Sequence, residues 1–207
     1  MLLVSLQMRG SVAGNYISVL FGDVMVHNGI FWTIGKKLYI GKLVVYCYVD
    51  ADFARLFFAR SRNGFVVTFS NFPLLWVSKL QTEIALSTLH SEYVELSHSV
   101  RALLPLKSLI KEVIENLGID CENLKFVSSS TVYEDNNGAI VVATSTGMTP
   151  SSKHIAVKHH WFRQHVGKEF LIRNIESENQ KSDLFTKGLQ GQIFVRIRKL
   201  PIRGTRA

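Results

Sequence analysis

Cysteine is almost absent from this chain of 207 residues, which contains only Cys47 and Cys121. Two widely separated thiols exclude a disulfide framework and a cysteine-rich zinc site, because both need several cysteines at short spacings. We therefore expect two small buried side chains in a reducing compartment. This predicts an intracellular protein, located in the cytoplasm or alternatively in the nucleus.

Long apolar runs are missing as well. Before residue 40 the longest uncharged stretches are 10–22 and 24–35, and both fall short of the roughly 18 to 20 residues that a membrane-spanning helix needs. The first nine residues also lack the basic start of a signal peptide. We expect no membrane partner.

Acidic residues are scarce. The chain has 16 Asp and Glu against 24 Lys and Arg, a net charge of +8 and a pI near 9.6. This excess attracts polyanions, of which nucleic acid and an anionic membrane surface are the usual candidates. Composition alone is equally compatible with basic residues that only keep the chain soluble. The few acids beside apolar segments are more informative, because burying an unpaired carboxylate costs free energy.

Short β-rich runs begin at residue 43. Three such runs, bounded by turn-forming residues, predict an antiparallel meander: 43–49, 64–69 and 73–77. The apolar period then lengthens to about three and a half residues, which predicts a long helix that Ser87 or Thr88 caps and Gly118 ends. Pro105 is expected to kink or divide this helix, because it lacks the amide hydrogen of the helix ladder.

The second half of the chain alternates strands and helices. Residues 125–135 predict a strand that ends at Asp135, and the following residues predict a helix. Helical spacing in 153–166, a strand at 169–175 and a helix at 177–189 complete the order. The sum is an α/β fold with a mixed sheet covered by helices.

The sequence pattern divides the chain into three regions. Residues 1–40 are apolar without a clear period and are expected to form a poorly defined extension. Residues 41–190 carry the patterned strands and helices of one domain. Residues 191–207 contain several arginines and are expected to form a basic, frayed tail.

Four acids fall at related places in this order of elements. Asp50 follows the first strand, Glu92 lies in the first turns of the long helix, Asp135 follows the fourth strand, and Asp183 lies on the last helix. If the first and fourth strands are neighbours, Asp50 and Asp135 lie side by side. Converging carboxylates repel each other, and Mg²⁺ ions would remove that repulsion, since two ions about 3.5 to 4 Å apart are the usual arrangement for attacking a phosphodiester.

From about residue 41 to 198 the chain resembles the ribonuclease H domain of Ty/copia-type retrotransposon polyproteins. Seven blocks in the same order carry the resemblance: Y-V-D-A-D-F-A (48–54), S-R-N-G-F-V-V-T (61–68), W-V-S-K-L-Q-T-E-I-A-L-S-T (76–88), S-E-Y-V-E-L-S (91–97), Y-E-D-N-N-G-A-I (133–140), S-K-H-I-A-V-K-H-H-W-F-R (152–163) and Q-K-S-D-L-F-T-K-G-L (180–189). The resemblance implies a ribonuclease H-like mixed sheet of five strands, three antiparallel and two added in parallel, flanked by helices.

The resemblance also implies an activity and a site. The expected reaction is hydrolysis of the RNA strand of RNA·DNA hybrids with two Mg²⁺ ions, for which Mn²⁺ can substitute, and a reverse-transcriptase domain in the parent polyprotein is an expected partner. The residues that match the metal-binding, catalytic acids are Asp50, Glu92, Asp135 and Asp183. Asp52 matches a second, non-catalytic acid. Basic residues of the sixth block are candidates for contacts with nucleic acid: Lys153, His154, Lys158, His160 and Arg163.

Several alternatives stay open. His90 and Ser91 stand where the family usually has Glu and Ala before the matching glutamate, so an inactive remnant that keeps the fold and a weak affinity for nucleic acid is the second hypothesis. Read singly, Asp183 could be a helix side chain paired with Lys181 or Lys187. Transposase and integrase domains share this order of elements, but they lack the acid on the long helix. The basic residues of 153–163 could equally form a solvated helix face.

Overall fold

The computed structural model describes residues 44–54, 60–69, 72–116, 130–147, 155 and 157–202. The expected extension over residues 1–40 lies outside this part of the chain, as do Cys121, Gly118 and residues 203–207. No helix in the described ranges is long and apolar enough to cross a membrane.

Five strands form one mixed sheet. Their bounds are β1 Val45–Asp52, β2 Arg62–Phe69, β3 Phe72–Leu80, β4 Ser130–Glu134 and β5 Phe170–Asn174. The strand order is β3-β2-β1-β4-β5. Antiparallel pairs join β1 to β2 and β2 to β3, whereas β4 runs parallel to β1 and β5 runs parallel to β4. The predicted meander and the ribonuclease H-like sheet with two parallel additions are both confirmed.

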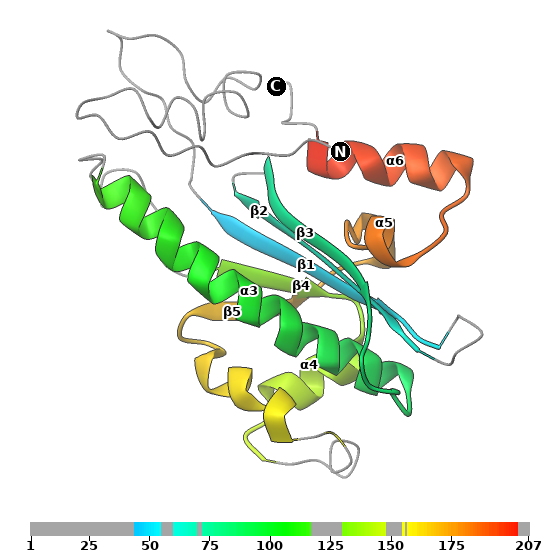
Figure 1. Cartoon of the computed structure of the whole chain (residues 1–207), viewed down its shortest axis with the longest axis horizontal. Helices are drawn as coiled ribbons and strands as arrows, with labels where there is room; N and C mark the ends of the chain where they lie inside the picture. Colours follow the sequence, from blue (N-terminus) through cyan, green and yellow to red (C-terminus); the bar gives the residue numbers. More distant parts are fainter. Residues whose placement is uncertain are drawn as a thin grey trace, which may run out of the picture.

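Helices cover both faces of this sheet (Figure 1). The long helix α3 (Thr88–Asn116) lies across β1 and β2, with α4 (Asn137–Thr144) beside it. The opposite face carries α5 (Asp183–Thr186) and α6 (Gly191–Ile202), which pack against β2 and β3. Because both faces are covered, β1 is buried along almost its whole length.

The helix α3 forms as its apolar period predicts. Large buried apolar side chains recur at intervals of three, four or seven residues, which keeps them on one face of the helix: Tyr93, Leu96, Val100, Leu103 and Ile110. The Ser87 hydroxyl accepts a hydrogen bond from the His90 amide at 3.1 Å and so caps the first turn, as predicted. Pro105 lies inside α3 without dividing it. Its ring lies on an exposed part of the helix, where water can bond to the carbonyl that proline leaves without a partner.

The predicted helix over 153–166 is wrong. This segment forms two 3-10 helices, η2 (Val157–His159) and η3 (Trp161–His165), with His159 and Phe162 buried between them and the rest of the fold. The spacing of its apolar residues resembled that of an α-helix, but the chain turns at His160 so that both side chains can reach the core.

The predicted helix over 177–189 is much shorter than expected. It is reduced to a 3-10 helix, η4 (Ser177–Asn179), and to α5. Between them the buried Gln180 side chain donates a hydrogen bond to the Val49 carbonyl at 2.7 Å, which interrupts a continuous helix. Most of the expected frayed tail forms α6, because Ile197 is buried and Arg196 bonds to Glu178.

Gly64 allows α5 to approach the sheet. It pairs with Asp50 across β1 and β2, and a Cβ at this position would lie 3.0 Å from Phe185 Cβ and still closer to a methyl group of Thr186. We expect Gly64→Ala to lower the free energy of unfolding by about 1 to 3 kcal/mol, because α5 must move away from β2. Denaturant unfolding monitored by circular dichroism measures this loss.

The matched control is Gly147→Ala, because a Cβ at Gly147 would meet nothing within 4 Å. Equal stability of the two variants would show that α5 does not depend on the close approach at Gly64.

Candidate metal centre

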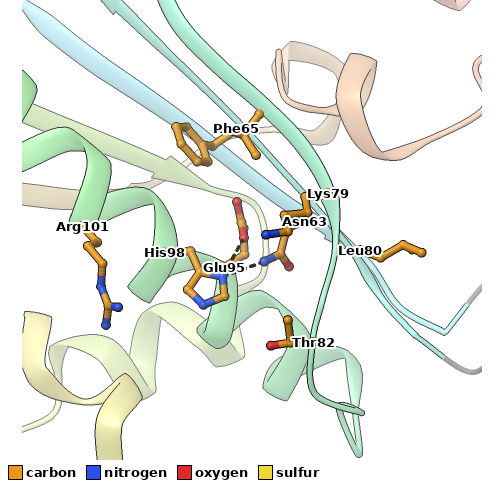
Figure 2. Close-up of a pocket in the computed structure, with 9 residues that line it drawn as sticks. Asn63, Phe65, Lys79, Leu80, Thr82, Glu95, His98 and Arg101 are labelled. Carbon is orange, nitrogen blue, oxygen red and sulfur yellow. Dashed lines mark hydrogen bonds and ion pairs between the residues drawn. The ribbon is translucent and has the colours of Figure 1, made fainter.

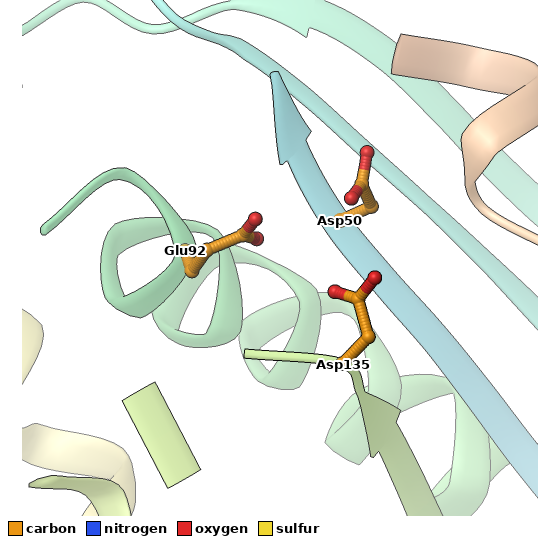
Figure 3. Close-up of side chains that lie close together, drawn as sticks. All are labelled: Asp50, Glu92 and Asp135. Carbon is orange, nitrogen blue, oxygen red and sulfur yellow. The ribbon is translucent and has the colours of Figure 1, made fainter. Parts of the chain in front are cut away.

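Strand pairing places two of the predicted acids at one end of the sheet. In the parallel pair of β1 and β4, Tyr48 lies opposite Tyr133. Asp50 and Asp135 each follow two residues later, so both reach the carboxyl ends of neighbouring strands. The first turns of α3 bring Glu92 over the same end. One carboxylate oxygen from each acid lies within 4.8 Å of the others, and Figure 3 shows the three side chains converging from β1, β4 and α3.

Asp50 is the most enclosed member of this triad, at 1% exposed. Its Oδ1 accepts a hydrogen bond from the Lys187 ammonium at 3.1 Å, and its Oδ2 accepts one from the Thr186 hydroxyl. Burial nevertheless raises the pKa of Asp50 to about 6, and the favourable contacts with Lys187 and Thr186 offset only part of this effect. Without a further cation, Asp50 therefore stays partly protonated near pH 6.

Glu92 is 4% exposed, and within the described part of the chain its Oε2 has no hydrogen-bond partner. Burial raises the pKa of Glu92 well above its ordinary value, and the negative charges of Glu134, Asp50 and Asp135 add to the effect. Together with the carboxylates of Asp50 and Asp135, the Glu92 carboxylate forms a set of hard oxygen ligands. This set suits a divalent ion such as Mg²⁺ or Mn²⁺.

Asp183, the fourth predicted acid, does not belong to this close triad. It lies in the first turn of α5, and its Oδ1 accepts a bond from Lys187 Nζ at 2.7 Å. Lys187 therefore joins Asp183 to Asp50. Burial raises the pKa of Asp183, although its pairing with Lys187 works in the opposite direction. The pairing that was the alternative interpretation of Asp183 is present, and it also connects this acid to the triad.

The triad opens into a cavity of about 440 Å³. Side chains from four elements and the loops beside them line it: Asp50, Asp52, Phe53, Thr88, Glu92, Asp135, Asn136 and Lys187. Asp52, at the end of β1, lies opposite Arg62.

Two buried acids next to the triad were not predicted. Glu134 is fully buried at the end of β4, where its Oε1 accepts a bond from the Asn136 amide at 3.0 Å. Glu95 is also fully buried, and neither of its carboxylate oxygens has a hydrogen-bond partner within the described residues. The signal for Glu95 was its position three residues after Glu92, which places both on the sheet-facing side of α3.

Glu95 lies behind the triad, beside a second cavity of about 310 Å³ between α3, β2 and β3 (Figure 2). The Asn63 amide and the His98 ring are 2.8 Å apart there, and His98 Nδ1 lies 3.7 Å from Glu95 Oε2. Burial raises the pKa of Glu95 well above its ordinary value, and the charges of Glu134 and Asp50 raise it further. Burial therefore favours the protonated form of Glu95.

The candidate residues for nucleic-acid contacts bond mainly within the chain. Lys158 pairs with Glu83, and the Tyr93 hydroxyl lies 2.8 Å from His160 Nδ1. The Arg163 guanidinium donates to backbone oxygens after α4, one of them at 2.8 Å. Lys153 and His154 lie outside the described residues. A role of these side chains in nucleic-acid binding stays a prediction.

Replacement of Glu95 by glutamine tests the cost of this buried acid. The raised pKa means that the folded chain holds a proton that the unfolded chain releases above about pH 4.5, so stability is lost as pH rises through and beyond that value. Glutamine cannot ionise. We expect Glu95→Gln to raise the free energy of unfolding at pH 7.5 by about 1 to 3 kcal/mol, and to change it much less at pH 4.

Thermal and denaturant unfolding at the two pH values measure this difference. Glu112→Gln, at an exposed position on the same helix, is the control and should show no such change with pH. A Glu95→Gln variant that loses stability at pH 7.5 would mean that Glu95 is ionised and paired in the folded chain.

Comparison with known proteins connects this geometry to mobile genetic elements. No protein-family model matches the chain. The Pol polyprotein of transposon TNT 1-94 from Nicotiana tabacum is 32% identical over 142 residues, which cover 68% of this chain and 10% of that polyprotein. The Pol polyprotein of transposon RE1 from Arabidopsis thaliana is 28% identical over 81% of this chain and 11% of its own length. The chain thus spans about a tenth of these relatives.

Among solved structures, the chain is similar to LC11-RNase H1, isolated from compost by a metagenomic approach. The TM-score is 0.48 with 16% sequence identity, and the similarity covers 69% of this chain and 92% of that one. The matched polyproteins, together with the strand order and pairing of the sheet, identify the chain as a ribonuclease H-like relative of the retrovirus-related Pol polyproteins of plant transposons.

Proposed function

We propose that this chain is the ribonuclease H of a Ty/copia-type retrotransposon and cleaves the RNA strand of RNA·DNA hybrids within the strand. The observation that carries the proposal is the convergence of Asp50, Glu92 and Asp135 from three separate elements. Three buried or half-buried acids would be costly at this place without a ligand of opposite charge. The relatives supply the biological setting, because a polyprotein that copies RNA into DNA produces such hybrids.

Asp50, Glu92 and Asp135 would hold the first divalent ion, and Asp50 with Asp183 would hold a second. When bound, two such ions supply an activated water and stabilise charge on the leaving oxygen. The carboxylates themselves orient this chemistry, and the cavity positions one phosphodiester over them. Binding the metal would also favour the ionised form of Glu92, whose pKa burial raises well above its ordinary value, and would keep Asp50 ionised near pH 6.

The remaining parts of the chain would bring the substrate to this site. The net charge of +8 attracts the phosphate backbone, and this attraction weakens as salt rises. A hybrid duplex is recognised through groove shape and 2′-hydroxyl groups, so we expect little sequence preference. A reverse-transcriptase domain of the parent polyprotein would deliver the hybrid. We expect this role to be carried out in the cytoplasm or the nucleus.

A second candidate is a fold that has lost catalysis but keeps weak binding to nucleic acid. The observation that favours it is Lys187, whose ammonium neutralises Asp50 and Asp183 without any metal. The unusual neighbours of Glu92 do not favour it. His90 accepts a bond from the Leu86 amide at 3.2 Å, and the Ser91 hydroxyl bonds within the first turn of α3, so both fit beside Glu92.

Cleavage of a labelled RNA·DNA hybrid tests the proposal. We expect the purified chain to cut the RNA strand with Mg²⁺ or Mn²⁺, to stop in EDTA, and to lose activity by about 1000-fold or more in Asp135→Asn, because that variant lacks one metal ligand. Gel analysis of the labelled strand measures the rate.

Glu112→Gln, which changes an exposed acid far from the cavity, should cleave at the rate of the unchanged chain. A folded chain that does not cut, or an Asp135→Asn variant that cuts normally, would reject the proposed activity and leave the second candidate.

A further inference from the structure

Lys187 occupies a defined place among the acids. Its Nζ lies 3.1 Å from Asp50 Oδ1 and 2.7 Å from Asp183 Oδ1. It therefore sits between one acid from the centre of the sheet and one acid from α5. Asp50 also belongs to the close triad with Glu92 and Asp135, and Lys187 lines the cavity into which that triad opens. The site thus has two adjacent positions for positive charge that share Asp50, and an ammonium holds one of them.

A divalent ion cannot share the position of this ammonium. An ion held between Asp50 Oδ1 and Asp183 Oδ1 would occupy the space of the Lys187 ammonium, which donates to both of these oxygens. Like charges at such short range repel strongly, and the low exposure of Asp50 leaves little water to screen them. The other Asp50 oxygen, Oδ2, accepts a hydrogen bond from the Thr186 hydroxyl and keeps a second lone pair for an ion at the triad. Lysine and metal are mutually exclusive between these two acids.

Lys187 can leave this position without unfolding its surroundings. Its side chain is 30% exposed, so the ammonium already contacts solvent. Lys187 is the residue that ends α5 and has an extended backbone, and a Cβ on the following Gly188 would meet nothing within 4 Å. A change of side-chain rotamer is therefore enough to turn the long, flexible chain toward water or toward a bound phosphate.

We propose that Lys187 is a built-in cation that fills the second metal position of this site. The inference rests on the proposed metal-dependent function. The first divalent ion binds at Asp50, Glu92 and Asp135, and a second ion enters only when Lys187 moves out from between Asp50 and Asp183. Lys187 is thus a positioning residue that sets how many ions the free protein holds.

Calorimetric titration with Mn²⁺ tests this inference without measuring activity. The unchanged chain should bind one ion and take up a second at least about tenfold more weakly. In Lys187→Met the second ion should bind at least about tenfold more tightly than in the unchanged chain, because the competing charge is gone. Lys187→Arg keeps the charge and should titrate like the unchanged chain.

Lys168→Met is the matched control, since it removes the same charge from an exposed turn before β5, at the opposite end of the strands from the acids. It should leave both affinities unchanged. Circular dichroism verifies that each variant is folded.

The possible outcomes separate this inference from the proposed function. If Lys187→Met binds both ions more weakly, the lysine only supports Asp50 and the inference is wrong. If Lys187→Met titrates like the unchanged chain, the inference is wrong and the metal site stands. If neither chain binds Mn²⁺ while both are folded, the metal-dependent function fails and the inference fails with it. Binding that appears only in Lys187→Met supports the inference.

Discussion

Repulsion among carboxylates that share one buried site is the constraint on which the rest of this structure depends. Parallel pairing of β1 with β4 forces Asp50 and Asp135 to the same end of the sheet, and α3 adds Glu92. Burial and mutual repulsion raise the pKa of Glu92. A sheet selected only for stability would carry apolar residues at these positions. The arrangement has a physical reason if the site binds a cation, because the positive charge would offset the repulsion among the acids.

The short helix α5, of only four residues, has a large influence on this site. The helix α5 can lie against β2 only because Gly64 has no side chain, and Thr186 and Lys187 at its end supply both partners of Asp50. Just before α5, Gln180 bonds to the Val49 carbonyl. Asp50 is therefore fixed from one face of the sheet by α5, while α3 places Glu92 from the other. The acids are held by packing on two sides and not by loops alone.

Much of this arrangement follows from the sequence. Each strand or helix can be recognised from the spacing of apolar residues within a short segment, and the order of these segments then indicates the fold. The adjacency of Asp50 and Asp135 follows once the first and fourth strands are neighbours. Two features could not be predicted in the same way. The spacing of apolar residues does not distinguish an α-helix from the 3-10 turns around Phe162, since both bring side chains to the core. The bridge made by Lys187 depends on the three-dimensional position of α5, which Gly64 controls from more than a hundred residues away.

The parallel partnership of β1 and β4 has a consequence for the order of folding. The meander of β1, β2 and β3 is built from hairpin contacts between neighbours in the sequence, whereas β4 must return past the whole of α3 to reach β1. Contacts between distant segments form slowly, because a long loop loses entropy when it closes. The meander can therefore assemble early on the ribosome, while the acidic centre waits until β4 has docked and the segment with Asp183 has emerged. A partly synthesised chain would therefore have the antiparallel meander before it has the acidic centre.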